Sequence, residues 1–187
     1  MISRMLPGLA GGLALALASM AVAQDEESSN RVAAETDWSV FVEDDPTECW
    51  AVTQPKETEN TRDGRVVAVR RGDILLFTFF RPSDGVAGQV TFTGGYPLST
   101  EAQITMVVGD DRFRLYTQED DPDTQVNEQE WAWAASADDD AEIVAAMRRG
   151  EDAVITAEST RGTQTEDTFS LMGYTAAVEE AQARCEE

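Results

Sequence analysis

Apolar and polar residues alternate along much of this chain with the two-residue period of a β-strand. The clearest pair is 104–108 and 113–115, joined by the turn Gly109-Asp110-Asp111, which predicts a β-hairpin. Residues 74–80 (ILLFTFF) are almost wholly apolar and predict a central strand that is covered on both faces. The same criteria predict further strands at 38–42, 48–53, 65–69, 89–93, 130–134, 153–157 and 168–172.

Two segments have the pattern of an amphipathic helix instead. Residues 139–149 begin in a run of aspartates and end in two arginines followed by Gly150, which suits the helix dipole at both ends. A second helix begins near Thr175, which can cap it, and places Val178, Ala181 and Cys185 on one buried stripe. About nine short strands and two short helices predict a mainly β fold, an antiparallel β-sandwich or a flattened barrel with the helices at its rim.

The chain divides simply. Residues 24–36 are polar, without apolar periodicity, and predict a flexible leader, while 56–64 predict a polar loop. No internal repeat and no linker rich in proline or glycine interrupts 37–187, which we interpret as a single domain.

The first 23 residues have the pattern of a secretory signal peptide. Arg4 precedes an apolar stretch from Leu9 to Val22, and Ala21-Val22-Ala23 supplies a small-residue cleavage site. The alternative, a retained membrane anchor, is less favoured because the stretch is short for a bilayer and no second apolar segment follows. We therefore expect cleavage after Ala23 and a periplasmic or secreted protein with no integral membrane segment.

Cys49 and Cys185 are the two cysteines of the chain. In an oxidising compartment an even count predicts a disulfide, and two cysteines allow one intramolecular pairing. Closing a loop of 136 residues (185 minus 49) contributes on the order of 5 kcal/mol in the chain-entropy model. A redox-active pair is disfavoured because the C-x-x-C spacing is absent.

The charge balance is strongly acidic, with 14 basic and 36 acidic residues and a net charge of −22. This balance argues against nucleic-acid binding and against adhesion to anionic lipid, because both depend on lysine and arginine. It is compatible with a solvated acidic surface or with a site for cations or basic proteins. The absence of histidine excludes Ser-His-Asp and Cys-His catalysis and histidine-based metal sites.

Three features of the sequence are candidate sites. The loop Asp120-Asp121-Pro122-Asp123 lacks the glycine and the final glutamate of an EF-hand, so we expect no specific metal site. The hydroxyl-rich run Ser159, Thr160, Thr163 and Thr165 has no evident base, and Arg161-Gly162-Thr163 predicts a turn with one basic contact. Glu130 is the one carboxylate beside tryptophans, but it should face away from Trp131, and we interpret Trp131 and Trp133 as core residues.

Several segments together resemble the invasion-associated locus B family of exported alphaproteobacterial proteins. They are Asp37-Trp38-Ser39-Val40-Phe41, Glu48-Cys49-Trp50, Gly94-Gly95-Tyr96-Pro97, 146–150, and Ser170-Leu171-Met172-Gly173-Tyr174-Thr175-Ala176-Ala177, followed by Cys185. The resemblance spans roughly residues 37–185 and implies an exported β-rich domain with no agreed catalytic residues. In pathogenic members it also implies a role in host-cell invasion. The acidic loop 118–129 and the strong negative charge depart from the family pattern and weaken that inference here.

The sequence favours a non-enzymatic envelope or secreted protein that binds a protein or an envelope component, without catalytic residues, cofactors or metal ions. The alternative is a hydrolase of envelope glycans that uses carboxylates alone. Two carboxylates facing each other across a tryptophan-lined groove would favour the hydrolase, and a closed sandwich without a cleft would favour binding.

Overall fold

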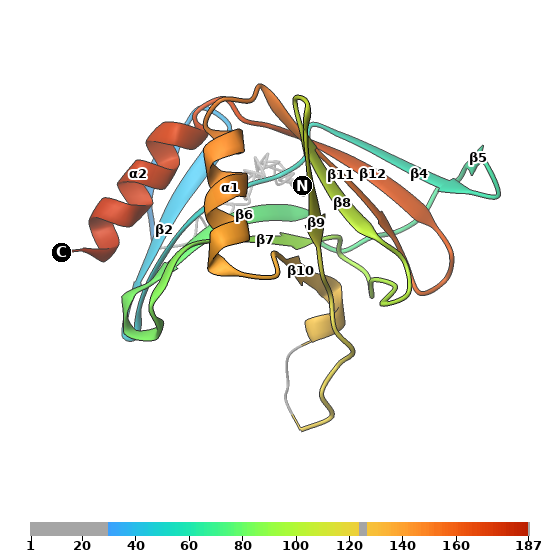
Figure 1. The fold of residues 1–187 in the computed structure, drawn as a ribbon, viewed down its shortest axis with the longest axis horizontal. Coiled ribbons are helices and arrows are strands. Elements are labelled where there is room, and N and C mark those ends of the chain that lie inside the picture. The colour runs from blue at the N-terminus through green and yellow to red at the C-terminus, as the bar shows by residue number, and fades with distance from the viewer. Residues whose placement is uncertain (1–29, 124–126, 187) are drawn as a thin grey trace, which may run out of the picture.

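The computed structural model describes residues 30–123 and 127–186, which form two six-stranded antiparallel sheets (Figure 1). The first sheet has the order β1 (Arg31–Glu35), β2 (Trp38–Asp44), β3 (Thr47–Thr53), β6 (Leu75–Arg81), β7 (Val86–Thr93) and β10 (Trp131–Trp133). The second has the order β5 (Arg65–Val66), β4 (Glu57–Arg62), β12 (Gln164–Ser170), β11 (Asp152–Glu158), β8 (Ile104–Val108) and β9 (Asp111–Leu115). The two sheets form a sandwich and do not close into a barrel, which confirms the first of the two expected architectures.

The two predicted helices are present. α1 (Ala137–Met147) begins two residues earlier than expected because Ser136 caps it, its Oγ accepting the Asp139 N–H at 3.2 Å. α2 (Tyr174–Cys185) begins after Gly173 and has no side-chain cap, so the expectation that Thr175 caps it is wrong. Short 3₁₀ turns lie at Pro82–Asp84 and Glu128–Glu130.

Two strands lie where the sequence predicted flexible or loop structure. β1 occupies part of the expected leader and pairs with β2, so the leader interpretation is wrong for Arg31–Glu35, while 1–29 lie outside the described residues. β4 occupies the expected polar loop and pairs with β12 through residues 57–61. Both strands are held by backbone hydrogen bonds and carry mostly exposed side chains, so neither has the apolar signal from which strands are recognised.

The core lies between the first sheet and three elements that pack on its inner face. α2 covers one end, where the rings of Trp38 and Tyr174 are 4.8 Å apart. The second sheet covers the other end, where Phe92 meets Phe169 edge-on at 6.1 Å. α1 lies beside β7, and its buried Asp140 accepts the Val90 N–H at 2.8 Å. In the described part of the chain, both helices and the second sheet thus contact one face of the first sheet.

The last helix is tied to the first sheet by the two cysteines. Cys49 on β3 and Cys185 at the end of α2 are both buried, with Cα atoms 5.8 Å apart and Sγ atoms 2.12 Å apart. This is the distance of a disulfide, and the helix turns Cys185 toward the sheet as the apolar stripe indicated. No helix among residues 30–123 and 127–186 is long and apolar enough to cross a membrane.

The first prediction concerns this pair. We expect non-reducing peptide mapping to recover a crosslinked Cys49–Cys185 fragment. Replacing both cysteines by alanine should lower the free energy of unfolding by about 2–5 kcal/mol, because the open chain gains conformational entropy when it unfolds. Denaturant titration of the variant beside the wild type measures the loss. Two freely alkylated thiols in the native protein would contradict the bond.

The second prediction concerns alkaline pH. Burial raises the pKa of the Tyr174 phenol above its usual value near 10, although its hydrogen bond with Thr78 acts in the opposite direction. The folded state therefore keeps a proton that the unfolded state loses above about pH 10, so stability should fall as pH rises past that value. Denaturant titrations between pH 8 and 11 should show this decline, and Tyr174→Phe should make its slope shallower. An unchanged slope in Tyr174→Phe would contradict the assignment.

Candidate functional site

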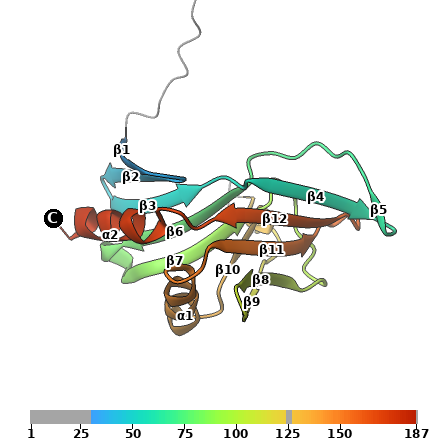
Figure 2. The same cartoon turned by 90° about the horizontal axis from the view of Figure 1, so that it is seen from above.

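A cavity of about 480 Å³ opens where β4 and β12 extend beyond the first sheet (Figure 2). The inward-facing side of these strands forms one wall, and the segments 69–71 and 95–97 with the β11–β12 turn complete the lining. Its charged residues are four arginines and one carboxylate: Arg62, Arg70, Arg71, Arg161 and Glu130. We call this cavity the arginine pocket.

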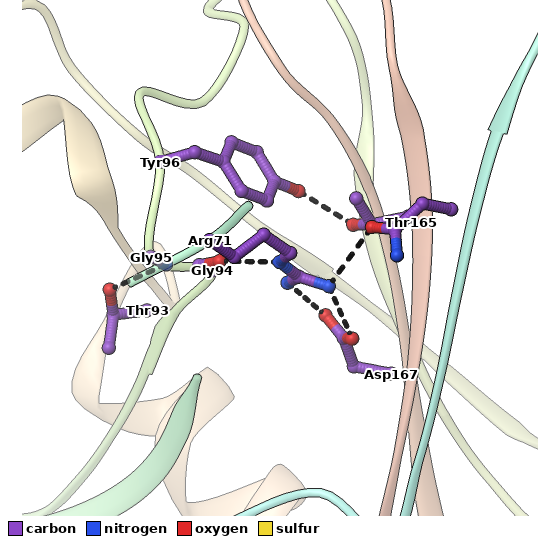
Figure 3. Close-up of polar contacts among 8 residues, drawn as sticks. Arg71, Thr93, Gly94, Gly95, Tyr96, Thr165 and Asp167 are labelled. Carbon is purple, nitrogen blue, oxygen red and sulfur yellow. Dashed lines mark hydrogen bonds and ion pairs between the residues drawn. The ribbon is translucent and has the colours of Figure 1, made fainter. Parts of the chain in front are cut away.

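The floor of the arginine pocket is a buried ion pair between Arg71 and Asp167 (Figure 3). Arg71 Nη1 and Nη2 donate to the two carboxylate oxygens at 2.7 and 2.6 Å, and Arg71 Nε donates to the Gly94 carbonyl at 2.8 Å. The Arg71 side chain is 6% exposed and that of Asp167 is 0% exposed. Burial raises the pKa of the Asp167 carboxyl, and the hydrogen bonds and charge of Arg71 oppose that rise. The pair is therefore bidentate and inaccessible to a substrate.

The turn Gly94-Gly95-Tyr96-Pro97 forms a second wall, and Gly95 is needed because two backbones meet there. The Gly72 N–H donates to the Gly95 carbonyl at 2.9 Å, and a Cβ on Gly95 would lie 2.6–2.8 Å from the Gly72 backbone. Gly95 also has φ +69°, a left-handed conformation that glycine adopts without steric cost. The turn places the Tyr96 hydroxyl 2.6 Å from Thr165 Oγ1 and its ring 5.0 Å from the Arg71 guanidinium carbon.

The β11–β12 turn forms the third wall and contains the hydroxyl-rich run. Ser159 Oγ accepts the N–H groups of Arg161 and Thr163 at 3.3 and 3.1 Å, which holds the turn in one conformation. Thr163 is buried and accepts a hydrogen bond from the Arg62 guanidinium. The sequence indicated a turn with one basic contact; the structure shows the turn, and around it a pocket with four arginines.

Glu130 lines the arginine pocket, but its neighbouring tryptophans are not core residues. Ala132 is buried on the inner face of β10, whereas Trp131 and Trp133 are half-buried and alternate with it onto the outer face. The interpretation of both tryptophans as core residues is therefore wrong, because a three-residue edge strand buries one face only. Among the described residues that line the pocket there is no tryptophan and no second carboxylate, so the geometry required of a glycan hydrolase is not found there.

The outer face of the first sheet carries a continuous row of aromatic side chains, which we call the aromatic row. Phe41 and Trp50 stack with centroids 5.6 Å apart, and Trp50 lies 6.0 Å from Phe79. Phe77 lies 5.0 Å from Phe79 and 5.6 Å from Trp131. The expectation that the strand at 74–80 is covered on both faces is thus wrong for its outer face, where these rings cover one another.

A groove of about 600 Å³ runs beside the aromatic row. Its lining includes the outward side chains of Phe41, Trp50 and Phe77, and the segment 54–56. Lys56, the single lysine of the chain, lies at this groove and pairs with Asp37 at 2.6 Å. The groove therefore combines an aromatic floor with a polar margin.

The acidic loop does not gather its carboxylates around a common point. Asp120 Oδ1 and Asp121 Oδ1 accept backbone N–H groups of Gln129 and Asp123, each at 2.8 Å. Residues 30–123 and 127–186 contain no group of three or more acidic or cysteine side chains placed to hold a metal ion.

Sequence reasoning did not single out Arg62, Arg70 and Arg71. They lie on or after β4 and β5. Their proximity to one another is visible only in the fold, where β12 brings Asp167 beneath them. The one available signal was the density of arginine between 62 and 71 in a chain that is otherwise strongly acidic.

Comparison with known proteins places this architecture among described relatives. The family model described as "Invasion associated locus B (IalB) protein" matches residues 38–182. The fold is similar to the crystal structure of invasion associated protein B from Bartonella henselae, with a TM-score of 0.54 and 15% sequence identity. That similarity covers 83% of this chain and 98% of the other, and at this identity it shows the fold alone. No curated protein matches the chain.

The third prediction tests the floor of the arginine pocket. Asp167→Asn keeps the shape of the side chain but leaves the buried Arg71 charge without its carboxylate, which should cost about 3–5 kcal/mol of unfolding free energy. Glu166→Gln is the matched control, because Glu166 is the exposed neighbour on the same strand. Denaturant titration of both variants measures the difference. Equal stabilities of the two variants would show that the ion pair does not hold the pocket together.

Proposed function

The chain belongs to the invasion associated locus B family, and we propose that it is an exported, non-enzymatic binding protein of the periplasm or the medium. Proteins of this family are exported. The expected signal peptide, cleaved after Ala23, and a disulfide between Cys49 and Cys185 are consistent with an oxidising compartment. The partner we propose is a protein. An envelope glycan is the alternative ligand, and the experiment below distinguishes the two.

The observation that carries this proposal is the aromatic row. A chain with 36 acidic and 14 basic residues has ample charge to cover its surface, yet one sheet face presents five aromatic side chains in mutual contact. Four of them are half-buried rather than buried, and neither helix packs over them in the described part of the chain. Aromatic residues are enriched in the centres of protein interfaces, where large apolar patches are covered by a partner.

The orientation of the rings favours a protein over a sugar. Phe41 and Trp50 are parallel within 8°, and Phe77 and Phe79 within 13°. Their faces are therefore partly covered by one another. A sugar would stack on an open ring face, whereas apolar protein side chains pack against ring edges as well. The groove beside the row, with Lys56 and Asp37 at its margin, suits a polypeptide segment with apolar and polar residues.

The non-enzymatic part of the proposal is supported by the chemistry of the arginine pocket. The arginine pocket contains hydroxyls, but its one lining carboxylate, Glu130, makes no hydrogen bond to them among the described contacts. Asp167, the carboxylate beneath the pocket, is fully buried and bidentate to Arg71. Nucleophilic catalysis by serine or threonine needs an adjacent base, and neither arrangement supplies one.

The fourth prediction tests the groove directly. A photo-crosslinking benzoylphenylalanine at the position of Val52, which lines the groove, should form a discrete protein adduct in cells that export the protein. The same residue at the position of Val66, which is exposed on β5 at the edge of the second sheet, is the matched control and should not form that adduct. Phe41→Thr should weaken the Val52 adduct, because it removes one stacked ring from the groove.

Two results would contradict the proposal. One is an identical adduct pattern from the positions of Val52 and Val66. The other is a pair of observations: the position of Val52 gives no protein adduct, and the exported protein is retained on purified cell-wall glycan unless it carries Phe41→Thr. That result would assign the groove to a glycan.

A further inference from the structure

The arginine pocket reverses the charge of the protein locally. The whole chain carries 14 basic and 36 acidic residues, but the pocket brings together Arg62, Arg70, Arg71 and Arg161. The carboxylates that face them are Glu130 at the wall and Asp167 at the floor. The exposed Glu59 and Glu166 lie opposite each other on the outer side of β4 and β12, so they do not face the pocket. Four positive charges against two negative charges leave the pocket cationic.

Two of the four arginines remain available to a ligand. Arg71 is occupied by Asp167 and the Gly94 carbonyl, and Arg62 donates to Thr163. The side chains of Arg70 and Arg161 are exposed and form no hydrogen bond or ion pair with any residue in 30–123 or 127–186. In a protein with such an excess of carboxylates, arginines that line a cavity without a carboxylate partner point to an external anion.

The walls of the pocket are organised before any ligand arrives. Ser159 Oγ fixes the β11–β12 turn that carries Arg161, and the Gly72–Gly95 hydrogen bond fixes the turn that carries Tyr96. The ion pair beneath them joins the segment that carries Arg70 to the second sheet. Preorganised donors lose little conformational entropy on binding, which favours a specific ligand over loose counterions.

We infer that the arginine pocket binds a phosphorylated sugar. Guanidinium groups match the oxygens of a phosphate in bidentate geometry, which assigns the anionic group to Arg70 and Arg161. The cavity of about 480 Å³ is within the range of small-molecule sites and far exceeds the space that a bare phosphate fills. Glu130 accepts hydrogen bonds and donates none when ionised, so it suits the hydroxyl groups of a sugar. The hydroxyl of Thr160 adds a neutral donor at the same wall.

The probes are glucose 1-phosphate, glucose and inorganic phosphate, each titrated into ¹⁵N-labelled protein comprising residues 24–187. Glucose 1-phosphate should shift the amide signals of Gly95, Tyr96 and 159–163 and bind more tightly than either component alone. R70Q/R161Q should weaken this binding roughly tenfold or more, because each charged hydrogen bond is lost. The matched control R112Q/R114Q removes two exposed arginines from β9 and should leave binding unchanged. Glu130→Gln should weaken binding of glucose 1-phosphate without affecting inorganic phosphate.

Several results would overturn the inference. If neither glucose 1-phosphate in solution nor a sugar phosphate on a lipid vesicle bound through Arg70 and Arg161, the inference would be wrong. Equal affinity of R70Q/R161Q and the wild type for glucose 1-phosphate would show that the ligand binds outside the arginine pocket. If inorganic phosphate bound as tightly as glucose 1-phosphate, the sugar would contribute nothing to the affinity, and the pocket would be a site for phosphate alone. Phe41→Thr changes the aromatic row and leaves the arginine pocket intact. The crosslinking experiment and this titration therefore test the proposed function and the present inference independently.

The source of the sugar phosphate is distinguished in a further arm. Phosphatidylcholine vesicles with phosphatidylinositol 4-phosphate present a phosphorylated sugar alcohol as a lipid headgroup. Flotation of the wild type with these vesicles, lost in R70Q/R161Q, would assign a lipid-borne ligand. Binding of glucose 1-phosphate without flotation would assign a soluble one. Both results support the inference. If R70Q/R161Q floated with the vesicles as the wild type does, the arginine pocket would not be the site that binds the lipid headgroup.

Discussion

The buried ion pair between Arg71 and Asp167 is the constraint on which one half of this molecule depends. A carboxylate with no exposed surface on β12 requires a cation, and the cation must come from a segment that leaves the sheet to reach it. Residues 67–74 do so, which is why the strand expected at 65–69 ends at Val66. Once Arg71 is in place, its Nε binds the Gly94 carbonyl and draws the turn after β7 onto the same floor. The arginine pocket is thus the surface above a single satisfied charge pair.

The other half depends on a junction of apolar and polar contacts around Trp38. Its Nε1 donates to the Ser170 carbonyl at 3.0 Å, and its ring packs against Tyr174, whose hydroxyl lies 3.1 Å from Thr78 Oγ1. Gly173 has φ +91°, and a Cβ there would lie 2.0 Å from the Glu35 carbonyl oxygen. The segment Ser170–Ala177, which most strongly resembles the family, therefore joins β1, β2 and α2. Its residues serve the packing of the fold.

These two halves leave the protein with two surfaces of different chemistry. The outer face of the first sheet is aromatic and is suited to a polypeptide partner, whereas the arginine pocket is cationic and hydroxyl-rich. The two adjoin at the start of β10, where Glu130 lines the pocket and Trp131 ends the aromatic row. A net charge of −22 around them keeps the remaining surface unfavourable for anionic partners, so an anion finds its favourable contacts at the pocket.

The sequence by itself determined the local properties of this protein. Strand alternation, helix ends, turn glycines and the cysteine pair are set by contacts within a few residues or by counting, so most strands, both helices and the sandwich class were predicted. Tertiary structure decided whatever depends on distant neighbours. β1 and β4 lack an apolar signal because backbone pairing alone holds them. The outward direction of Trp131 and Trp133 depends on which side of an edge strand is covered. The arginine pocket depends on Asp167, 96 residues from Arg71, since a charge is stable in the interior only where the fold brings its partner.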